Sequence, residues 1–129
     1  MIEKHLLVPA RLRKPPGGGF SWVDRRFLRD HSAGLSRDAI LLYFFFAAVS
    51  DKLGISFYGD TAIAGRLRLD EGAVASARDE LVRRDLVAYG SPLTQVLSLP
   101  EPRVQRAAGD AESLGSILRR LGGDRREGP

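Results

Sequence analysis

The chain has 129 residues, of which 43% are hydrophobic, and its 20 Lys and Arg residues against 16 Asp and Glu give a formal net charge of +4. It has no cysteine and two histidines, which excludes disulfides and a thiolate zinc site and leaves no plausible Ser-His-Asp triad. No signal peptide is indicated, because Ile2-Glu3-Lys4-His5 leads into only three apolar residues. No membrane span is indicated either, because the longest apolar run, Ala39 to Val49, is far short of the roughly 20 residues that cross a bilayer. Composition therefore predicts a cytoplasmic protein without catalytic residues, metal or cofactor, and without a membrane or small-molecule substrate as its target.

Residues 1–19 are predicted to form a basic N-terminal strand and arm that ends in a Pro/Gly linker. Leu6-Leu7-Val8 favours a short strand, and Pro15-Pro16-Gly17-Gly18-Gly19 is stiff and then flexible. Residues 1–35 carry seven basic against three acidic residues, whereas residues 36–99 carry seven against eight. If the protein binds DNA, the cations Arg11, Arg13 and Lys14 would let the arm follow a minor groove or the backbone, because binding to phosphates requires a basic surface. A solvated, disordered tail is the alternative.

A buried central helix is predicted over residues 37–52. Ser36 provides an N-cap, the eleven residues Ala39 to Val49 are all apolar, and Gly54 supplies the stop. The aromatic run Tyr43 to Phe46 covers more than one helix face, so we expect at least one ring to point away from the core of its own domain. Two coverings remain open: the N-terminal segment, through Leu6 to Val8 and residues 20–28, or another protomer or protein.

The next elements alternate between strand and helix. Ile55 to Tyr58 favours a small strand, and Gly59-Asp60-Thr61 begins an eight-residue helix with Ile63, Ala64 and Leu67 on one face. After a short turn, a helix is predicted from Asp70 to Arg84, with Val74, Ala77 and Leu81 as its buried stripe. Residues 86–89 and 95–99 then predict a hairpin around the loop 90–94.

This order of elements resembles a known family. The stretch from Phe20 to Leu99, with the pattern LSRDAILLYFFFAAVSDKLGISFYGDTAIAGRLRLDEGAVASARDELVRRDLVAY, resembles the winged-helix domains of bacterial replication-initiation and primosome proteins. The opening MIEKHLLVPARLRKPP with FSWVDRRFLRD is also similar to small helix-turn-helix proteins encoded beside transposable elements. The resemblance implies a mainly α fold with a small β-hairpin, a three-helix core plus wing over residues 20–99. It also implies a non-enzymatic protein that binds double-stranded DNA in transcription regulation or replication initiation, with a mobile element as one setting.

In such a domain the helix 70–84 would approach the major groove, which defines the remaining candidate residues. Its outward positions include Ala75 and Ser76, which suit thymine methyl groups and base edges, but also the acidic Glu71 and Asp79. Arginine, the commonest reader of guanine, is missing from that face, which departs from a DNA-reading member. The candidates for phosphate contact outside the arm are Arg37, Arg66, Arg68 and Arg78.

A second class of function stays open beside DNA binding. A winged helix also serves as a protein adaptor, which here would use helix 37–52, the acidic third helix or a C-terminal helix as its docking surface. Pro100-Glu101-Pro102 ends the domain, and residues 100–129 form a C-terminal appendage. Within it, residues 110–121 predict a short amphipathic helix that docks, joins a homodimer or protein partner, or stays disordered, before a disordered end. DNA binding predicts affinity that falls with salt, whereas the adaptor predicts a stable protein complex.

Overall fold

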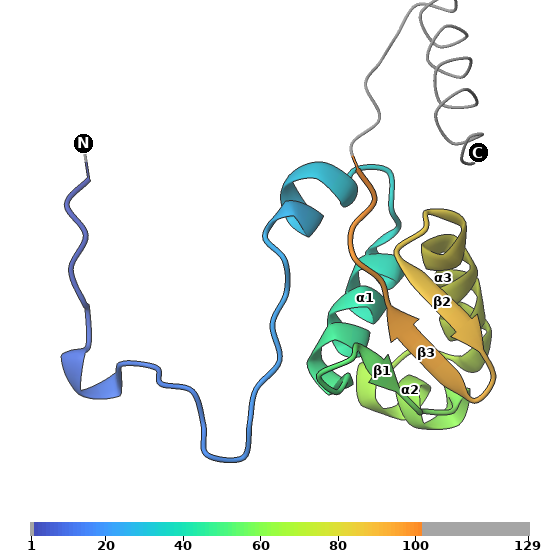
Figure 1. Ribbon diagram of the computed structural model, residues 1–129, viewed down its shortest axis with the longest axis horizontal. Coiled ribbons are helices and arrows are strands. Elements are labelled where there is room, and N and C mark those ends of the chain that lie inside the picture. Colours follow the sequence, from blue (N-terminus) through green and yellow to red (C-terminus); the bar gives the residue numbers. More distant parts are fainter. Residues whose placement is uncertain (1, 102–129) are drawn as a thin grey trace, which may run out of the picture.

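The computed structural model describes residues 2–101, which fold into an α+β domain preceded by an extended arm (Figure 1). In chain order the domain contains α1 (Arg37–Val49), β1 (Ile55–Ser56), α2 (Asp60–Leu67), α3 (Glu71–Arg83), β2 (Val87–Gly90) and β3 (Leu93–Val96). The strands form an antiparallel sheet in the order β1-β3-β2. Helix α1 packs on α3 and β3, and α3 also packs on α2 and β2, so the core lies between the helices and one face of the sheet.

Helix α1 begins where the sequence predicts and ends one turn earlier. The Ser36 hydroxyl accepts a hydrogen bond from the Ala39 N–H at 3.0 Å, as an N-cap does. The predicted end at residue 52 is wrong, because Ser50 adopts an extended backbone and Asp51 forms a tight turn. In that turn the Asp51 carboxylate accepts the N–H groups of Leu53 and Ile55, which stops the helix before Gly54.

Helices α2 and α3 meet at a three-residue turn. Arg68 has a left-handed backbone, with φ 59°, and its N–H donates to the Ala64 carbonyl to end α2. Asp70 then caps α3 by accepting the Ala73 N–H at 2.7 Å. The predicted cap and the buried stripe of Val74, Ala77 and Leu81 are confirmed, and α3 ends at Arg83, one residue before the predicted end.

The sheet differs from the prediction in its strand ends. Strand β1 is limited to Ile55 and Ser56, which pair with Gln95 and Thr94, so the predicted strand 55–58 is two residues too long. The hairpin is tighter than predicted, because Gly90 pairs with Leu93 and β3 covers 93–96 instead of 95–99. Gly54, beside β1, has φ +84°, and a Cβ atom there would lie 2.8 Å from the Val96 carbonyl oxygen. This close approach explains why glycine occupies the position.

The aromatic residues of α1 lie within their own domain, so the expected outward-pointing ring is wrong. Phe46 is fully buried, and Phe45 packs edge-on against Tyr58 with ring centroids 5.2 Å apart. Phe27, in a helical turn at Phe27–His31, is fully buried and stacks on Tyr43 at 3.8 Å. Phe27 also meets Phe44 edge-on at 5.6 Å. Of the two expected coverings of α1, the structure therefore shows the N-terminal one. Phe27 provides it and is the residue of that segment that is fully buried.

The rest of the N-terminal segment does not cover the domain. Leu6-Leu7-Val8 forms no strand in the structure, and the segment contains instead a single turn of 3-10 helix at Pro9–Arg11. Phe20, Trp22 and the apolar residues of the arm stay exposed, and the arm stands clear of the helices and sheet (Figure 1). The predicted strand is wrong because these residues have no strand edge beside them to complete its hydrogen bonds.

The predicted C-terminal helix at 110–121, with most of the appendage 100–129, lies outside the described residues. Among residues 2–101, no helix is both long enough and apolar enough to cross a membrane.

Candidate nucleic-acid interface

The surface formed by α2, the turn after it and α3 is the candidate interface. The two helices are fixed together by a hydrogen bond from the Thr61 hydroxyl to Glu71 Oε2, at 2.9 Å. The bond joins the first turn of α2 to the first turn of α3. The N-terminal end of α3 is therefore held in one orientation and is exposed to solvent at Glu71 and Gly72.

Two of the predicted phosphate ligands lie next to this end of α3. Arg66 is in the last turn of α2 and Arg68 is in the turn, and both side chains are exposed. The Arg66 guanidinium carbon lies 5.9 Å from the centroid of the Tyr58 ring, which restricts it without removing its charge from solvent. The structure thus brings Arg66 and Arg68 together at one edge of the surface.

Arg37 lies at the other end of α3. As the first residue of α1 it follows Ser36, whose N–H and hydroxyl both donate to the Glu80 carboxylate, at 2.6 and 2.7 Å. These two hydrogen bonds hold the pKa of Glu80 below its ordinary value. Since Glu80 is in the last turns of α3, Arg37 is separated from Arg68 by much of a helix about 20 Å long. Arg37 is exposed but does not join the Arg66 and Arg68 pair.

The expected phosphate contact of Arg78 is not compatible with its position. Its side chain is 7% exposed, forms an ion pair with Asp60 at the start of α2, and stacks on Tyr89 of β2 with the guanidinium carbon 4.3 Å from the ring centroid. We therefore correct this prediction: the charge of Arg78 is used inside the domain. It links α2, α3 and the hairpin, and it cannot reach DNA in this arrangement.

The outward face of α3 is acidic, as the sequence indicated. Glu71, Ser76 and Asp79 are exposed, and Ala75 is half-buried. With Arg78 turned inward, this face has no basic side chain before Arg83. Ser76 can donate to and accept from base edges, and Ala75 has little free surface.

The arm cations Arg11, Arg13 and Lys14 are all exposed and lie away from the domain (Figure 1). The chain reverses at a turn in which the Gly19 N–H donates to the Pro16 carbonyl at 3.0 Å. The structure therefore does not bring these cations next to Arg66 and Arg68, and it leaves them unobstructed for an extended partner.

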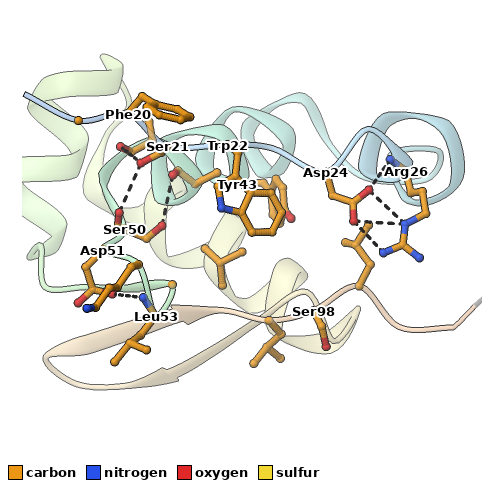
Figure 2. A pocket seen from close by; sticks show the side chains of 18 of the residues that line it. Phe20, Ser21, Trp22, Asp24, Arg26, Tyr43, Ser50, Asp51, Leu53 and Ser98 are labelled. Carbon is orange, nitrogen blue, oxygen red and sulfur yellow. Dashed lines mark hydrogen bonds and ion pairs between the residues drawn. The ribbon is translucent and has the colours of Figure 1, made fainter. Parts of the chain in front are cut away.

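Away from this surface, a groove lies between residues 18–26 and the region where α1 and β3 end, with a volume of about 830 Å³ (Figure 2). Ser21 holds one wall in place, because its hydroxyl donates to the Ala48 carbonyl at 3.0 Å. Asp24 and Arg26 form an ion pair at one end, which lowers the pKa of Asp24 to about 2. No group of three or more His, Cys, Asp or Glu residues within 2–101 is placed to hold a metal ion.

The sequence did not predict two contacts between distant residues, Ser36 with Glu80 and Asp60 with Arg78. Ser36 and Glu80 are 44 positions apart, and Asp60 and Arg78 are 18 apart, so no helical or strand period relates them. The opposite charges of Asp60 and Arg78 were visible, but their pairing depends on how α2 packs against α3.

Comparison with known proteins gives no match: no family model, curated protein or solved structure resembles the chain significantly. Geometry and charge within residues 2–101 therefore carry the functional argument.

Proposed function

We propose that residues 20–99 form a winged helix-turn-helix and that the protein is a non-enzymatic DNA-binding protein of transcription regulation or replication initiation. The observation that carries this proposal is the order α1, β1, α2, α3, β2, β3, in which α2 and α3 meet at a three-residue turn and a hairpin follows beside them. In this arrangement α3 is the helix that approaches the major groove, and the β2–β3 hairpin is the wing.

Charge placement supports a binding mode dominated by phosphate contacts. Arg66 and Arg68 lie next to the exposed N-terminal end of α3, and the arm adds Arg11, Arg13 and Lys14. Cations in these places release counterions from DNA whatever its sequence. Glu71 and Asp79 repel phosphates and leave Ser76 as the main reader of base edges on α3. We therefore expect modest sequence preference and a strong dependence of affinity on salt.

The test is a fluorescence-anisotropy titration of a random duplex at several salt concentrations. We expect a linear fall of log affinity with log salt for the wild type. The Arg66→Ala, Arg68→Ala double variant should reduce the slope by about 2, because each lost phosphate contact removes about 0.9. A triple Ala variant of the arm cations should reduce it by about 3 if all three contact phosphates.

The matched control is the Arg25→Ala, Arg83→Ala double variant. It also removes two exposed arginines, one before Phe27 and one at the far end of α3 from Arg66. Its slope should stay close to that of the wild type. Equal losses in the two double variants would show that net charge matters and the α2–α3 surface does not. Absence of binding at low salt would remove DNA binding as an autonomous activity.

The acidic face of α3 favours one second candidate, a winged-helix adaptor that docks a basic protein surface. Glu71 and Asp79 are exposed there, and α3 has no exposed basic side chain before Arg83, because Arg78 is buried. Glu71→Gln and Asp79→Asn distinguish the two functions. If α3 approaches DNA, removing each charge should raise affinity for DNA about twofold or more. If α3 binds protein, these variants should leave DNA binding unchanged.

A further inference from the structure

The groove beside α1 presents apolar side chains without a covering. Phe20 and Trp22 are 70% and 76% exposed on one wall, and Leu53 is 67% exposed on the other (Figure 2). Large rings left in water beside a concave surface are the usual mark of a docking site.

Two hydrogen-bonding groups in the groove are suited to an extended backbone. Tyr43 lines the groove and is 3% exposed, and its hydroxyl makes no hydrogen bond with any of residues 2–101. Ser98 lies at the opposite wall, in the extended chain that follows β3. Its backbone N–H and carbonyl likewise have no backbone partner among the described residues.

The direction of the Ser98 backbone follows from the residues before it. The Val96 N–H donates to Gly54 beside β1, whereas the Leu97 N–H donates to Leu86 on the opposite side, next to β2. Because backbone groups alternate along an extended chain, those of Ser98 face the β1 side again. There the chain has already turned away at Asp51–Gly54, which leaves the backbone groups of Ser98 without a backbone partner on the side of the groove.

The N-terminal arm is an apolar extended segment that needs a covering. Leu6, Leu7 and Val8 are each more than half exposed, with Leu7 at 85%. Val8 is β-branched and favours strands, and in this structure the segment has no strand beside it. The arm therefore offers apolar side chains and free backbone groups. The groove has side chains and backbone groups of the same kinds that lack a partner.

We propose that the arm of a second copy of this chain occupies the groove, with Leu6-Leu7-Val8 adding a strand at Ser98, and that the exchange is reciprocal. In each copy, the chain's own arm points away from its own groove. Residues 18–20 already form one wall of the groove, and the Pro16–Gly19 turn leads the preceding residues away from the domain (Figure 1). A second copy related by a two-fold axis has no such restriction.

The reciprocal exchange also supplies sufficient contact area. A stable dimer buries roughly 1,200–2,000 Å² in total, and two-fold symmetry forms each arm–groove contact twice. Each arm and groove together therefore contribute roughly 600–1,000 Å². Covering the exposed rings of Phe20 and Trp22 provides up to roughly 300–500 Å² of this area, because a buried aromatic side chain removes about 150–250 Å² from water, and Leu6 to Val8 with Leu53 add to it.

Disulfide trapping tests the contact directly, since the wild-type chain has no cysteine. Leu7→Cys and Ser98→Cys chains, one with a size tag, are mixed and mildly oxidised, and the products are separated without reductant. We expect a covalent heterodimer of the two variants. Leu7→Cys mixed with Ser76→Cys is the matched control, because Ser76 is an exposed serine on α3, and it should give little product. Equal trapping with Ser76, or none with Ser98, would overturn the proposal.

A chain carrying both Leu7→Cys and Ser98→Cys distinguishes the second copy from the chain's own arm. Reciprocal exchange predicts a covalent dimer, whereas a monomer with an internal disulfide would overturn the proposal.

Light scattering after size exclusion measures the association without cysteines. The wild type should be dimeric, and Leu6→Asp with Leu7→Asp should raise the dimer dissociation constant at least about 100-fold, because charges replace buried apolar side chains in both arms. Leu93→Asp, an exposed leucine of the hairpin, should leave it unchanged. Circular dichroism should show the same helix content in all three proteins.

A wild type that stays monomeric at every concentration, or a dimer that persists in the arm variant, would overturn the inference. None of these three experiments involves DNA, so DNA binding is tested separately.

Discussion

The domain from Phe27 to Leu99 and the segment before Phe27 use similar apolar residues in opposite ways. Within the domain, Phe27, Leu42 and Phe46 are fully buried, whereas Leu7 and Trp22 in the N-terminal segment are mostly exposed. The difference does not come from hydrophobicity, because both regions contain leucine and aromatic side chains. It comes from the presence or absence of other elements that can cover them.

This comparison separates residues that determine the fold from residues available for association. Burial of an apolar side chain stabilises by about 1.5–3 kcal/mol, and in the domain that gain contributes to folding. The same gain in the N-terminal segment is obtained when a partner covers it. Substitutions in buried and exposed positions should therefore differ in their effect on the free energy of unfolding.

Phe46→Ala should have the largest effect. The ring is fully buried in α1, so truncation leaves a cavity and should lower the free energy of unfolding by about 3–5 kcal/mol. Phe57→Ala, which removes a ring that is 69% exposed, should change it by less than about 0.5 kcal/mol. Urea denaturation followed by circular dichroism measures both. A similar loss of unfolding free energy in the two variants would contradict the distinction between buried and exposed apolar residues.

Arg78→Met should have the next largest effect, because it leaves Asp60 without its ion-pair partner and removes the stacking on Tyr89. We expect a loss of about 2–3 kcal/mol, reduced from a fully buried pair because Asp60 is partly exposed. Arg66→Met is the control, with an exposed guanidinium. Asp60→Asn added to Arg78→Met should recover part of the loss. Equal stability of the Arg78 and Arg66 variants would show that the inward charge is dispensable.

Gly54→Ala tests the backbone where β1 meets β3. The positive φ and the 2.8 Å approach to the Val96 carbonyl both oppose a Cβ atom, so we expect a loss of about 1–2 kcal/mol. Gly59→Ala is a matched change, because φ there is −80° and no atom would lie within 4 Å of the new methyl group. Thermal unfolding compares the two, and a Gly59 variant less stable than the Gly54 variant would refute the argument.

The smallest expected effect concerns pH. Hydrogen bonds from Ser36 lower the pKa of Glu80 below its ordinary value of 4.5, so the ionised form is favoured in the folded protein. The resulting stability is fully present above about pH 5 and is lost as pH falls through the lowered pKa. Glu80→Gln should cost about 1 kcal/mol at neutral pH and flatten this part of the stability profile. A profile unchanged by Glu80→Gln would contradict the assignment.

Local signals in the sequence predicted the elements well, because caps and apolar spacing act over a few residues. Ser36 and Asp70 cap their helices, and Val74, Ala77 and Leu81 are buried as expected. Strand ends were predicted less well, since they depend on pairing partners such as Gly90 with Leu93. The position of Arg78 was not predictable from its neighbours, because its partners Asp60 and Tyr89 come from two other elements. For the same reason the sequence indicated the cations of the candidate interface but not which of them lie together.

Trp22 is the single tryptophan of the chain, and it lies on the groove wall, outside the hydrophobic core. Its indole is already surrounded largely by water in the folded protein. Intrinsic fluorescence should therefore change little when the domain melts, and iodide should quench it readily before any denaturant is added. A blue shift of its emission would instead indicate that a partner covers the indole in the groove. The fluorescence of Trp22 therefore measures occupancy of the groove without an added label.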